Sequence, residues 1–193
     1  MATPPAGYKG RGAAGNPGGR FELLERERDP QADEIGNAPV TVVETRSART
    51  IIARNDSPDI PFSQSINPYQ GCEHGCIYCY ARPSHAYMGL SPGLDFETRL
   101  FAKVNAAELL RKELSRPGYR CDLIAIGSNT DPYQPVERDL RITRGILEVL
   151  RDFRHPVGIV TKSALVERDI DLLAPMAAEG LAEVFVSVTT LDP

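Results

Sequence analysis

The sequence predicts an α/β protein built on a parallel β-sheet. In the second half of the chain, short runs rich in Val and Ile alternate with longer segments of helical periodicity. Strands and helices that alternate in this way form βαβ units, because two parallel strands need a long crossover connection. We therefore expect a parallel sheet that is covered by helices on both faces.

Four strands of this sheet and three intervening helices are predicted in the main part of the chain. Asn105 followed by Glu108 has the pattern of a capping box, Ser163 is a typical N-cap residue, and Gly180 is a typical helix terminator. Residues 84–95 are rich in Gly, Ser and Pro and are expected to form an exposed connector. The expected strands are Ser65–Tyr69, Asp122–Gly127, Val157–Thr161 and Glu183–Thr189, and the expected helices are Asn105–Ser115, Glu137–Asp152 and Leu165–Ala178.

Three segments are expected along the chain. Residues 1–37 form a disordered or weakly structured tail, because their first part is nearly all Gly, Ala, Pro, Asn and basic residues that bury little apolar surface. Residues 38–60 form an N-terminal extension, in which Val40–Thr45 and Thr50–Arg54 are β-branched and predict two short strands. Residues 61–193 form the main domain. Because the last predicted strand has no covering helix after it, we expect this domain to continue in a longer protein.

The composition excludes several classes of protein. A net charge of −4 and an isoelectric point near 5.5 leave no basic field that would recruit nucleic acid or an acidic membrane. No apolar run approaches the ~18 residues of a membrane-spanning helix, and the start of the chain lacks the features of a signal peptide. We therefore expect a cytoplasmic protein with no membrane partner, whose clustered cysteines bind a metal instead of forming disulfides.

Three of the four cysteines, Cys72, Cys76 and Cys79, lie in one short loop. Neighbouring thiolates repel one another unless a cation neutralises them, so this spacing indicates a metal or iron–sulfur centre. Gly71 and Gly75 allow the backbone to wrap tightly, because glycine adopts positive φ without steric cost. This loop is the part of the chain that points to a specific chemistry.

Three kinds of centre are compatible with the loop. A structural zinc site needs a fourth ligand, for which His74 or His85 is available. A ferredoxin-type cluster needs a fourth thiolate; the remaining cysteine, Cys121, opens a predicted strand and is expected to be a buried core residue. The third is a four-iron cluster held by three cysteines, with one iron open to an external ligand. His155, which precedes a proline, is expected to have a structural role.

The loop and its flanks resemble the cluster-binding loop of the radical S-adenosylmethionine (SAM) superfamily. The resemblance is carried by Asn67-Pro68-Tyr69-Gln70-Gly71-Cys72 and by Cys76-Ile77-Tyr78-Cys79-Tyr80. The Pro-Tyr-x-Gly-Cys start and the Tyr-Cys-Tyr end are similar to the spore photoproduct lyase-like branch. The resemblance covers the chain from about residue 61 onward and implies the N-terminal part of a partial (βα)6 barrel, about four of its six βα units.

Within that fold, the resemblance implies that polar residues at the C-terminal ends of the strands surround SAM. Lys162 would pair with the SAM carboxylate, Ser187 and Thr189 would face the ribose hydroxyls, and Tyr78 would stack near the adenine. Purely structural roles are the alternative for each; Glu137, at a predicted helix start, would only favour the helix dipole. The candidates for the SAM amino group follow the second strand and are Ser128, Asn129, Thr130 and Asp131.

The resemblance implies a radical SAM enzyme with two cofactors, a [4Fe-4S] cluster on Cys72, Cys76 and Cys79 and SAM on the open iron. Reductive cleavage of SAM yields methionine and a 5′-deoxyadenosyl radical that abstracts hydrogen from a substrate. The expected partners are an electron donor (a reductase, flavodoxin or ferredoxin) and a substrate whose identity the sequence leaves open, nucleic acid included. An incomplete barrel is expected to bind a cluster and yet fail to turn over.

Two alternative functions stay open. The first is a non-catalytic zinc or iron–sulfur binding module, which would be indifferent to SAM. The second, within the family, is a repair lyase that acts on a DNA photoproduct. Relatives in that branch use an additional cysteine after the second strand as a hydrogen donor, and this chain has no cysteine there.

Overall fold

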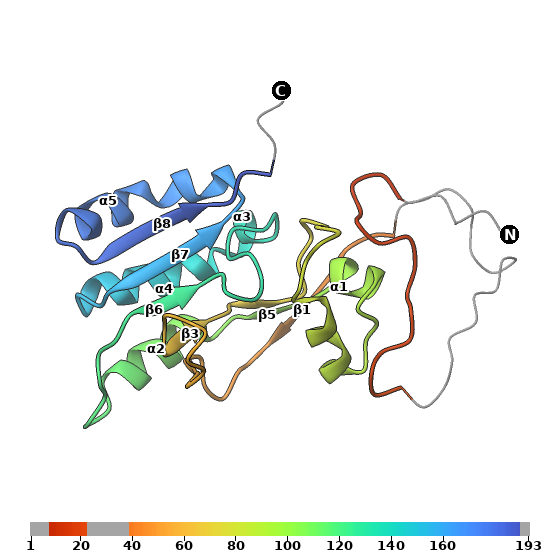
Figure 1. Ribbon diagram of the computed structural model, residues 1–193. Helices are drawn as coiled ribbons and strands as arrows, with labels where there is room; N and C mark the ends of the chain where they lie inside the picture. The colour runs from red at the N-terminus through yellow and green to blue at the C-terminus, as the bar shows by residue number, and fades with distance from the viewer. Residues whose placement is uncertain (1–7, 23–38, 190–193) are drawn as a thin grey trace, which may run out of the picture. The chain divides into compact units, whose positions relative to one another are not determined.

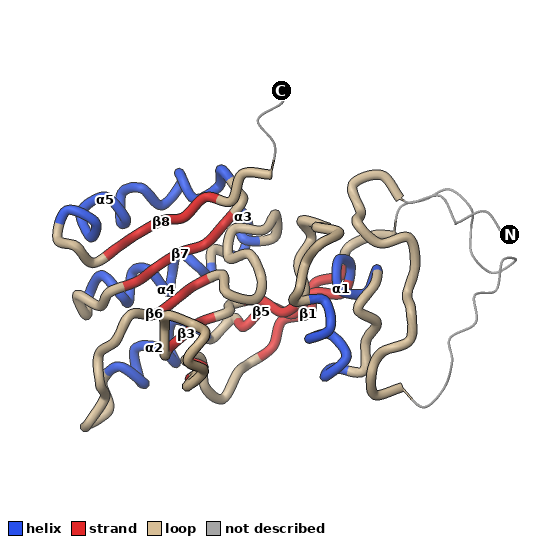
Figure 2. Tube along the Cα trace, viewed as in Figure 1, coloured by secondary structure: helices blue, strands red, loops and turns tan. Residues whose placement is uncertain are grey.

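The computed structural model describes residues 8–22 and 39–189. The chain divides into two compact units, each built from two stretches of sequence (Figures 1 and 2). The first unit comprises Met1–Glu44 and Gln70–Phe101, and the second comprises Thr45–Tyr69 and Ala102–Pro193. The division falls inside three strands that form one sheet in the order β1-β5-β4: β1 (Val42–Arg46), β4 (Tyr69–Gln70) and β5 (Arg99–Lys103).

The second unit is built on a five-stranded sheet in the order β2-β3-β6-β7-β8. The last four strands are parallel to their neighbours, and β2 pairs with β3 in the antiparallel sense. The predicted parallel sheet is therefore confirmed, and the strand predicted over Val157–Thr161 has those bounds. The strands are β2 (Ala53–Arg54), β3 (Gln64–Ile66), β6 (Ile124–Ile126), β7 (Val157–Thr161) and β8 (Ala182–Val186).

The helices of the second unit connect successive parallel strands. Parallel strands in consecutive spatial order, joined by right-handed crossovers, place all their helices on one face of the sheet. In agreement, α2 packs against α4 and α4 packs against α5. The expectation of helices on both faces is wrong, and the open sheet is consistent with a partial barrel. These elements are α2 (Ala106–Leu114), α3 (Glu137–Leu140), α4 (Ile142–Asp152), the 3-10 helix η2 (Ala164–Asp169) and α5 (Ile170–Ala178).

The helix predicted over Glu137–Asp152 is divided in two by a left-handed residue. Arg141 has a φ of 51° between α3 and α4. The carboxylate of Glu137 folds back onto the start of α4, where it accepts hydrogen bonds from the backbone N–H groups of Thr143 (3.0 Å) and Arg144 (3.3 Å). It thus satisfies donors that the first turn of a helix leaves unpaired. Periodicity cannot reveal this break, because both helices share one apolar stripe.

The two predicted helix caps have different outcomes. Ser163 accepts a hydrogen bond from the Leu165 N–H at 3.2 Å and caps η2, as predicted. Asn105 precedes α2 but makes no side-chain cap; its amide instead exchanges two hydrogen bonds with the backbone of Ala48, at 2.9 and 3.0 Å. A residue that suits a helix cap has therefore been used to attach the segment after β1.

The first unit has more order than its composition suggests. Residues 84–95 are not an exposed connector, since they carry part of the 3-10 helix η1 (Arg82–Met88), the start of α1 (Leu94–Thr98) and several buried side chains. Asn16 exchanges hydrogen bonds with the backbone and side chain of Asp95, at 2.8 and 2.9 Å. Residues 8–22 contain no helix or strand but are held by bonds of this kind, and the other residues of the expected disordered or weakly structured tail, 1–7 and 23–37, lie outside the described residues.

The core of the second unit is made by the inward faces of the strands and helices. Its largest fully buried side chains include Ile66, Ile124, Ile126, Ile146, Leu147, Leu150 and Ile159. In the part of the chain that the structure describes, β8 is an edge strand on which Phe185 and Val186 are more than half exposed. No helix among the described residues has the length and apolar character needed to cross a membrane.

His155 is buried in the second unit and has structural contacts. Its Nε2 lies 2.7 Å from the Tyr119 hydroxyl, and its Nδ1 lies 3.0 Å from the Pro156 carbonyl oxygen. Burial lowers the pKa of His155, although the Pro156 carbonyl and Asp122 act in the opposite direction. Burial also raises the pKa of Tyr119 to about 12, so its hydroxyl stays protonated at neutral pH.

We predict that His155 contributes to acid sensitivity. A histidine with a lowered pKa stabilises the fold while it is neutral, above its ordinary pKa of about 6.5, and this contribution is lost as the pH falls toward the lowered value. The midpoint temperature of thermal unfolding should decrease when the pH is lowered from about 7.5 to about 5.5. The decrease should be smaller for His155→Gln, and equal slopes for the two proteins would contradict the prediction.

Candidate functional site

The cysteine loop of the first unit is held by its backbone. The Cys72 N–H donates to the Phe96 carbonyl at 2.8 Å, and the Cys79 N–H donates to the Cys76 carbonyl at 3.2 Å. The second bond spans four residues and closes a turn between the last two cysteines. Cys72 is buried in an apolar cluster with Ala81 and Phe96, and Cys79 packs against this cluster.

Glycines permit the path of the loop, as predicted. Gly71 has a φ of 79° and Gly75 a φ of 62°, in the region that glycine adopts without strain. A Cβ on Gly71 would lie 2.7 Å from Leu100 Cδ2 and 2.9 Å from the Phe96 carbonyl oxygen. The first glycine is thus needed for both its conformation and its lack of a side chain.

The donor chemistry of the loop fits a soft metal centre. All three cysteines are free thiols, and thiolates are the ligands of iron–sulfur clusters and zinc. Cys72 is buried and the other two are half-buried, so a bound centre would be partly shielded from water. Among the described residues, no three His, Cys, Asp or Glu side chains converge in an arrangement that would hold a metal ion. The loop therefore supplies the ligand types, and their convergence on a metal belongs to the proposal below.

The expected fourth ligands have other environments. His85 is fully buried, its Nε2 lies 3.0 Å from the Arg99 carbonyl oxygen, and its ring contacts Phe96 edge-on at 5.3 Å. Cys121 is exposed and belongs to the second unit, so the prediction of a buried core cysteine is wrong. It precedes β6 and lies in a stretch without helix or strand. The side chain of His85 is thus engaged within the first unit.

Asn67 organises the strand ends of the second unit. It follows β3, and its side-chain oxygen accepts hydrogen bonds from the backbone N–H groups of Asn129 (3.0 Å) and Thr130 (3.4 Å). Its amide nitrogen lies 3.5 Å from Ser128 Oγ, and its carbonyl accepts a bond from Lys103 Nζ at 2.8 Å. Burial lowers the pKa of Lys103. The structure thus brings the polar residues after β6 next to the end of β3.

Two of the four candidates after β6 have structural partners. The Thr130 hydroxyl donates to the Tyr69 carbonyl at 2.9 Å and is buried. Asp131 accepts hydrogen bonds from the Tyr133 N–H (2.9 Å), the Thr161 hydroxyl (2.7 Å) and the Lys162 N–H (2.9 Å). Asp131 therefore ties the ends of β6 and β7 together. Ser128 and Asn129 are half-buried, and the Ser128 hydroxyl has the Asn67 amide as a neighbour.

The remaining candidates lie at exposed or half-exposed positions. Lys162 directly follows β7 and is half-buried, whereas Ser187 and Thr189 follow β8 and are exposed. The Ser187 N–H donates to the Thr161 carbonyl at 2.8 Å, which keeps the chain beside β7 past the end of the strand. Tyr78, on the cysteine loop, is 64% exposed. The cysteine loop and Tyr78 belong to the first unit, and the strand-end candidates belong to the second.

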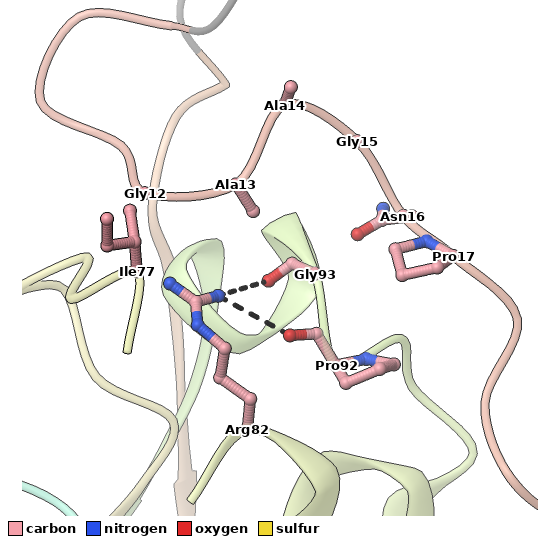
Figure 3. A pocket seen from close by; sticks show the side chains of 10 residues that line it. All are labelled: Gly12, Ala13, Ala14, Gly15, Asn16, Pro17, Ile77, Arg82, Pro92 and Gly93. Atoms are coloured by element: carbon pink, nitrogen blue, oxygen red, sulfur yellow. Dashed lines mark hydrogen bonds between the residues drawn. The ribbon is translucent and has the colours of Figure 1, made fainter. Parts of the chain in front are cut away.

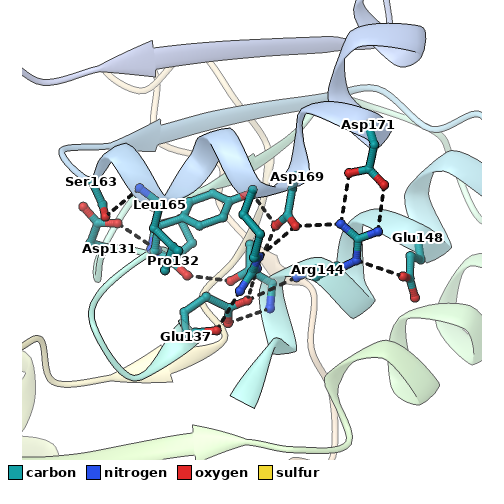
Figure 4. Close-up of polar contacts among 12 residues, drawn as sticks. Asp131, Pro132, Glu137, Arg144, Glu148, Ser163, Leu165, Asp169 and Asp171 are labelled. Carbon is teal, nitrogen blue, oxygen red and sulfur yellow. Dashed lines mark hydrogen bonds and ion pairs between the residues drawn. The ribbon is translucent and has the colours of Figure 1, made fainter. Parts of the chain in front are cut away.

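Glu137 is a buried carboxylate with several hydrogen-bond partners, whereas its position in the sequence predicted only a favourable interaction with the helix dipole. Its side chain, labelled in Figure 4, has no solvent exposure. It accepts hydrogen bonds from the Tyr69 hydroxyl and, at 2.8 Å, from Arg168 Nη2. Burial, followed by the charge of Glu137, raises the pKa of Tyr69 far above its ordinary value. Tyr69 is therefore held as a neutral donor, two residues before Gly71 and the cysteine loop.

Asp169 extends this network toward α4 and η2. It has no solvent exposure and accepts hydrogen bonds from Tyr133 (3.0 Å), Arg168 (2.8 Å) and Arg144 (2.9 Å). Burial acts to raise the pKa of Asp169, and the bonds from the two arginines and the tyrosine outweigh it, so the pKa is lowered. With two buried carboxylates and their arginines, this part of the site is rigid.

Comparison with known proteins decides the family. The sequence model of the Radical SAM superfamily matches residues 66–193. The chain belongs to this superfamily. The match begins at the end of β3 and includes the cysteine loop and every strand-end candidate. Membership indicates an enzyme that uses SAM in radical chemistry, and the α/β unit with its parallel strands is consistent with the superfamily's partial barrel.

Three relatives are similar to this radical SAM protein over different lengths. "Uncharacterized protein Rv2578c" of Mycobacterium tuberculosis and "Uncharacterized protein Mb2609c" of Mycobacterium bovis are each 38% identical over 174 residues, 90% of this chain and 50% of the relative. "Uncharacterized protein MJ0683" of Methanocaldococcus jannaschii is 35% identical over 107 residues, 55% of this chain and 38% of the relative. The chain spans about half the length of the mycobacterial relatives. No solved structure matches it.

Sequence reasoning missed several residues that hold the site. Asn67 lay inside the recognised motif, but its role depends on the neighbouring strand. Arg82 and Glu97 lie on either side of the predicted connector, residues 84–95, and neither was considered for the site. Glu137 follows a proline-rich turn, where a carboxylate is usual at a helix start. The sequence feature that could have identified these residues is a charged side chain in an otherwise apolar stretch.

We predict that Glu137→Ala destabilises the chain strongly. Removal of the Glu137 carboxylate leaves the buried Tyr69 hydroxyl and the first-turn N–H groups of α4 without their acceptor and takes one of two carboxylates from Arg168, and breaking a buried pair in this way costs about 3–5 kcal/mol. Urea unfolding of the 193-residue chain would measure the free energy of unfolding. Glu148→Ala is the matched control, because Glu148 is 47% exposed and pairs with Arg144 at 3.4 Å; its cost should be below about 1 kcal/mol. Equal costs for the two variants would contradict the role of Glu137 as a buried hydrogen-bond acceptor.

Proposed function

We propose that this protein is a radical SAM enzyme in which Cys72, Cys76 and Cys79 hold a [4Fe-4S] cluster with one open iron. The observation that carries the proposal is the loop itself: three free thiols, wound by two positive-φ glycines, inside the segment that matches the superfamily. A cluster with SAM bound to it supplies reductive cleavage of SAM to methionine and a 5′-deoxyadenosyl radical, which abstracts hydrogen from the substrate.

The chain contributes ligands, orientation and shielding. The three cysteines act as thiolates, so metal uptake releases their protons. Lys162 pairs with the SAM carboxylate, and Ser128 and Asn129 take the SAM amino group. Their backbones are already fixed by Asn67 and Asp131, so these groups need little reorganisation on binding.

Other proposed contacts with SAM complete the set. Ser187 and Thr189 hydrogen-bond the ribose hydroxyls, and Tyr78 stacks on the adenine; their exposure is consistent with groups that meet a ligand. Thr130 and Asp131 act mainly by holding the strand ends, since their side chains bond within the protein. A one-electron donor, such as a reductase, flavodoxin or ferredoxin, is the required partner. The free thiols are consistent with a reducing compartment such as the cytoplasm.

Within the superfamily, we place the chain near the spore photoproduct lyase-like branch. The support is the Pro68-Tyr69-Gln70-Gly71-Cys72 start and the Tyr78-Cys79-Tyr80 end of the loop. A nucleic-acid substrate follows from this placement as one option. Repair with a cysteine as hydrogen donor is not part of the proposal, because Cys121 precedes β6 whereas the strand-end candidates follow it.

Anaerobic reconstitution tests the function. The 193-residue chain, supplied with iron and sulfide, should bind about four irons, and the full-length protein treated in the same way should release 5′-deoxyadenosine with dithionite and SAM. Cys76→Ala should lose most of its iron and the release together, whereas Cys121→Ala should behave like the wild type. Tightly bound zinc, or a cluster whose reduced spectrum is unchanged by SAM, would refute the enzyme and support a non-catalytic metal module.

Ser128→Ala tests the proposed SAM contact. The loss of one hydrogen bond costs about 0.5–1.5 kcal/mol, so the dissociation constant for SAM should rise about two- to tenfold. Equilibrium dialysis of the reconstituted protein against labelled SAM would measure it. Ser115→Ala is the control, because its hydroxyl bonds only to the Arg111 carbonyl on an exposed helix end. An unchanged dissociation constant in Ser128→Ala would remove this residue from the site.

A further inference from the structure

Arg82 directs its guanidinium back onto the cysteine loop. Nε and Nη2 donate to the Cys76 carbonyl oxygen at 3.1 and 2.9 Å. Nη1 donates to the carbonyls of Pro92 and Gly93 at 3.4 and 3.2 Å, as Figure 3 shows, and Nη2 also pairs with Glu97. A guanidinium presents its donors in a rigid planar fork. All three nitrogens of Arg82 are thus committed to protein partners, so the residue is placed to hold structure and not to bind a ligand.

Glu97 forms an ion pair that holds Arg82 in place. Its side chain has no solvent exposure, and a buried carboxylate is tolerated only when it is paired and hydrogen-bonded. One oxygen takes Arg82, and the other accepts the Gly12 N–H at 3.0 Å. A Cβ on Gly12 would lie 1.9 Å from the Gly75 carbonyl oxygen, so only glycine allows this approach. We call Arg82, Glu97 and Gly12 the Arg82 clamp.

The clamp is built into the wall of a cavity. This cavity, of about 510 Å³, lies between the N-terminal segment and the start of α1, and Arg82 is its charged lining residue (Figure 3). The side chain of Arg82 is 13% exposed, so the clamp is largely shielded from water. Charge-assisted hydrogen bonds are stronger in such surroundings than on an open surface. The lining consists of Gly12, Ala13, Ala14, Gly15, Asn16, Pro17, Ile77, Arg82, Pro92 and Gly93.

The Cys76 carbonyl oxygen accepts hydrogen bonds from both Arg82 and the cysteine loop. The donor in the loop is the N–H of Cys79, so a single oxygen joins the clamp to the turn that separates the last two cysteines. Cys72 is fixed separately, through its N–H bond to the Phe96 carbonyl, and the Phe96 ring lies 5.5 Å from the Arg82 guanidinium carbon. The backbone at all three cysteines is therefore connected by hydrogen bonds to one short segment, residues 96–97.

We propose that Arg82 is a positioning residue for the cluster: the Arg82 clamp holds the Cys76–Cys79 turn before iron binds. A turn held in advance loses less conformational entropy on ligation, which increases the affinity for the metal centre. This inference rests on the proposed function, since it takes the bound group to be an iron–sulfur cluster.

The test compares two double variants, one that removes the buried ion pair of the Arg82 clamp and one that removes an ion pair on the surface. Arg82→Met combined with Glu97→Gln removes both charges, so no buried carboxylate is left unpaired. The control is Arg111→Met with Asp152→Asn, which removes an ion pair whose side chains are 52% and 37% exposed. Each chain is reconstituted anaerobically with iron and sulfide, and iron retention is measured against increasing chelator. Circular dichroism of the apo-proteins and electron paramagnetic resonance of the reduced clusters are recorded in parallel.

We expect the clamp variant to keep its fold and to lose iron at a chelator concentration about 10- to 100-fold lower than the wild type, the range typical of residues that orient metal ligands. Its reduced-cluster spectrum should also change, because local charge and hydrogen bonding tune such clusters. The control should match the wild type in both. Retention and spectrum equal to the wild type would overturn the proposal.

A second variant decides the matter if the double variant does not fold. Arg82→Lys keeps a partner for Glu97 but replaces the planar fork with a point charge, so the Cys76 carbonyl loses its paired donors. Its iron retention should fall between those of the wild type and the control for a complete loss, Cys76→Ala; retention equal to the wild type would overturn the proposal. If the wild type itself takes up no iron, the proposed function fails, which is a different result.

Discussion

Two buried glutamates determine how this chain presents its functional groups. A carboxylate without access to water must have a full set of donors, because an unpaired buried charge is too costly to keep. Glu97 meets this requirement in the first unit with Arg82 and the Gly12 N–H, and so the N-terminal segment and the cysteine loop are drawn to α1. Glu137 meets it in the second unit with Tyr69, Arg168 and the first turn of α4.

Both glutamates act on the same short stretch of sequence from its two ends. Glu137 holds the side chain of Tyr69, where the chain leaves β3, and the Arg82 clamp holds the carbonyl of Cys76 farther along. Backbone and buried-ion contacts thus set the path of the loop, while its three cysteines form no disulfide. A loop that binds a metal needs this division, since its ligand side chains cannot also serve as its support.

Local sequence patterns predicted the elements that depend on local energetics. The run Val157–Thr161 is apolar and β-branched, so β7 was expected with the bounds it has, and Ser163 caps η2 as its side chain favours. The break at Arg141 was missed because the acceptor that stabilises it, the Glu137 carboxylate, lies outside the helix it caps. Asn105 likewise has a partner, Ala48, that is distant in sequence. Composition could not show the specific bonds that hold residues 8–22, such as those between Asn16 and Asp95.

The sequence alone determined the superfamily and the parallel α/β character and predicts the cysteine ligands, because each depends on residue type and short spacing. Only the tertiary structure decided which polar residues are available and which are supports. Thr130 and Asp131 are occupied in joining strand ends, Cys121 is exposed, and Arg82 holds Cys76 through its carbonyl. The physical reason is that a polar side chain acquires its role from the groups it pairs with, and here most of those partners lie far away in the sequence.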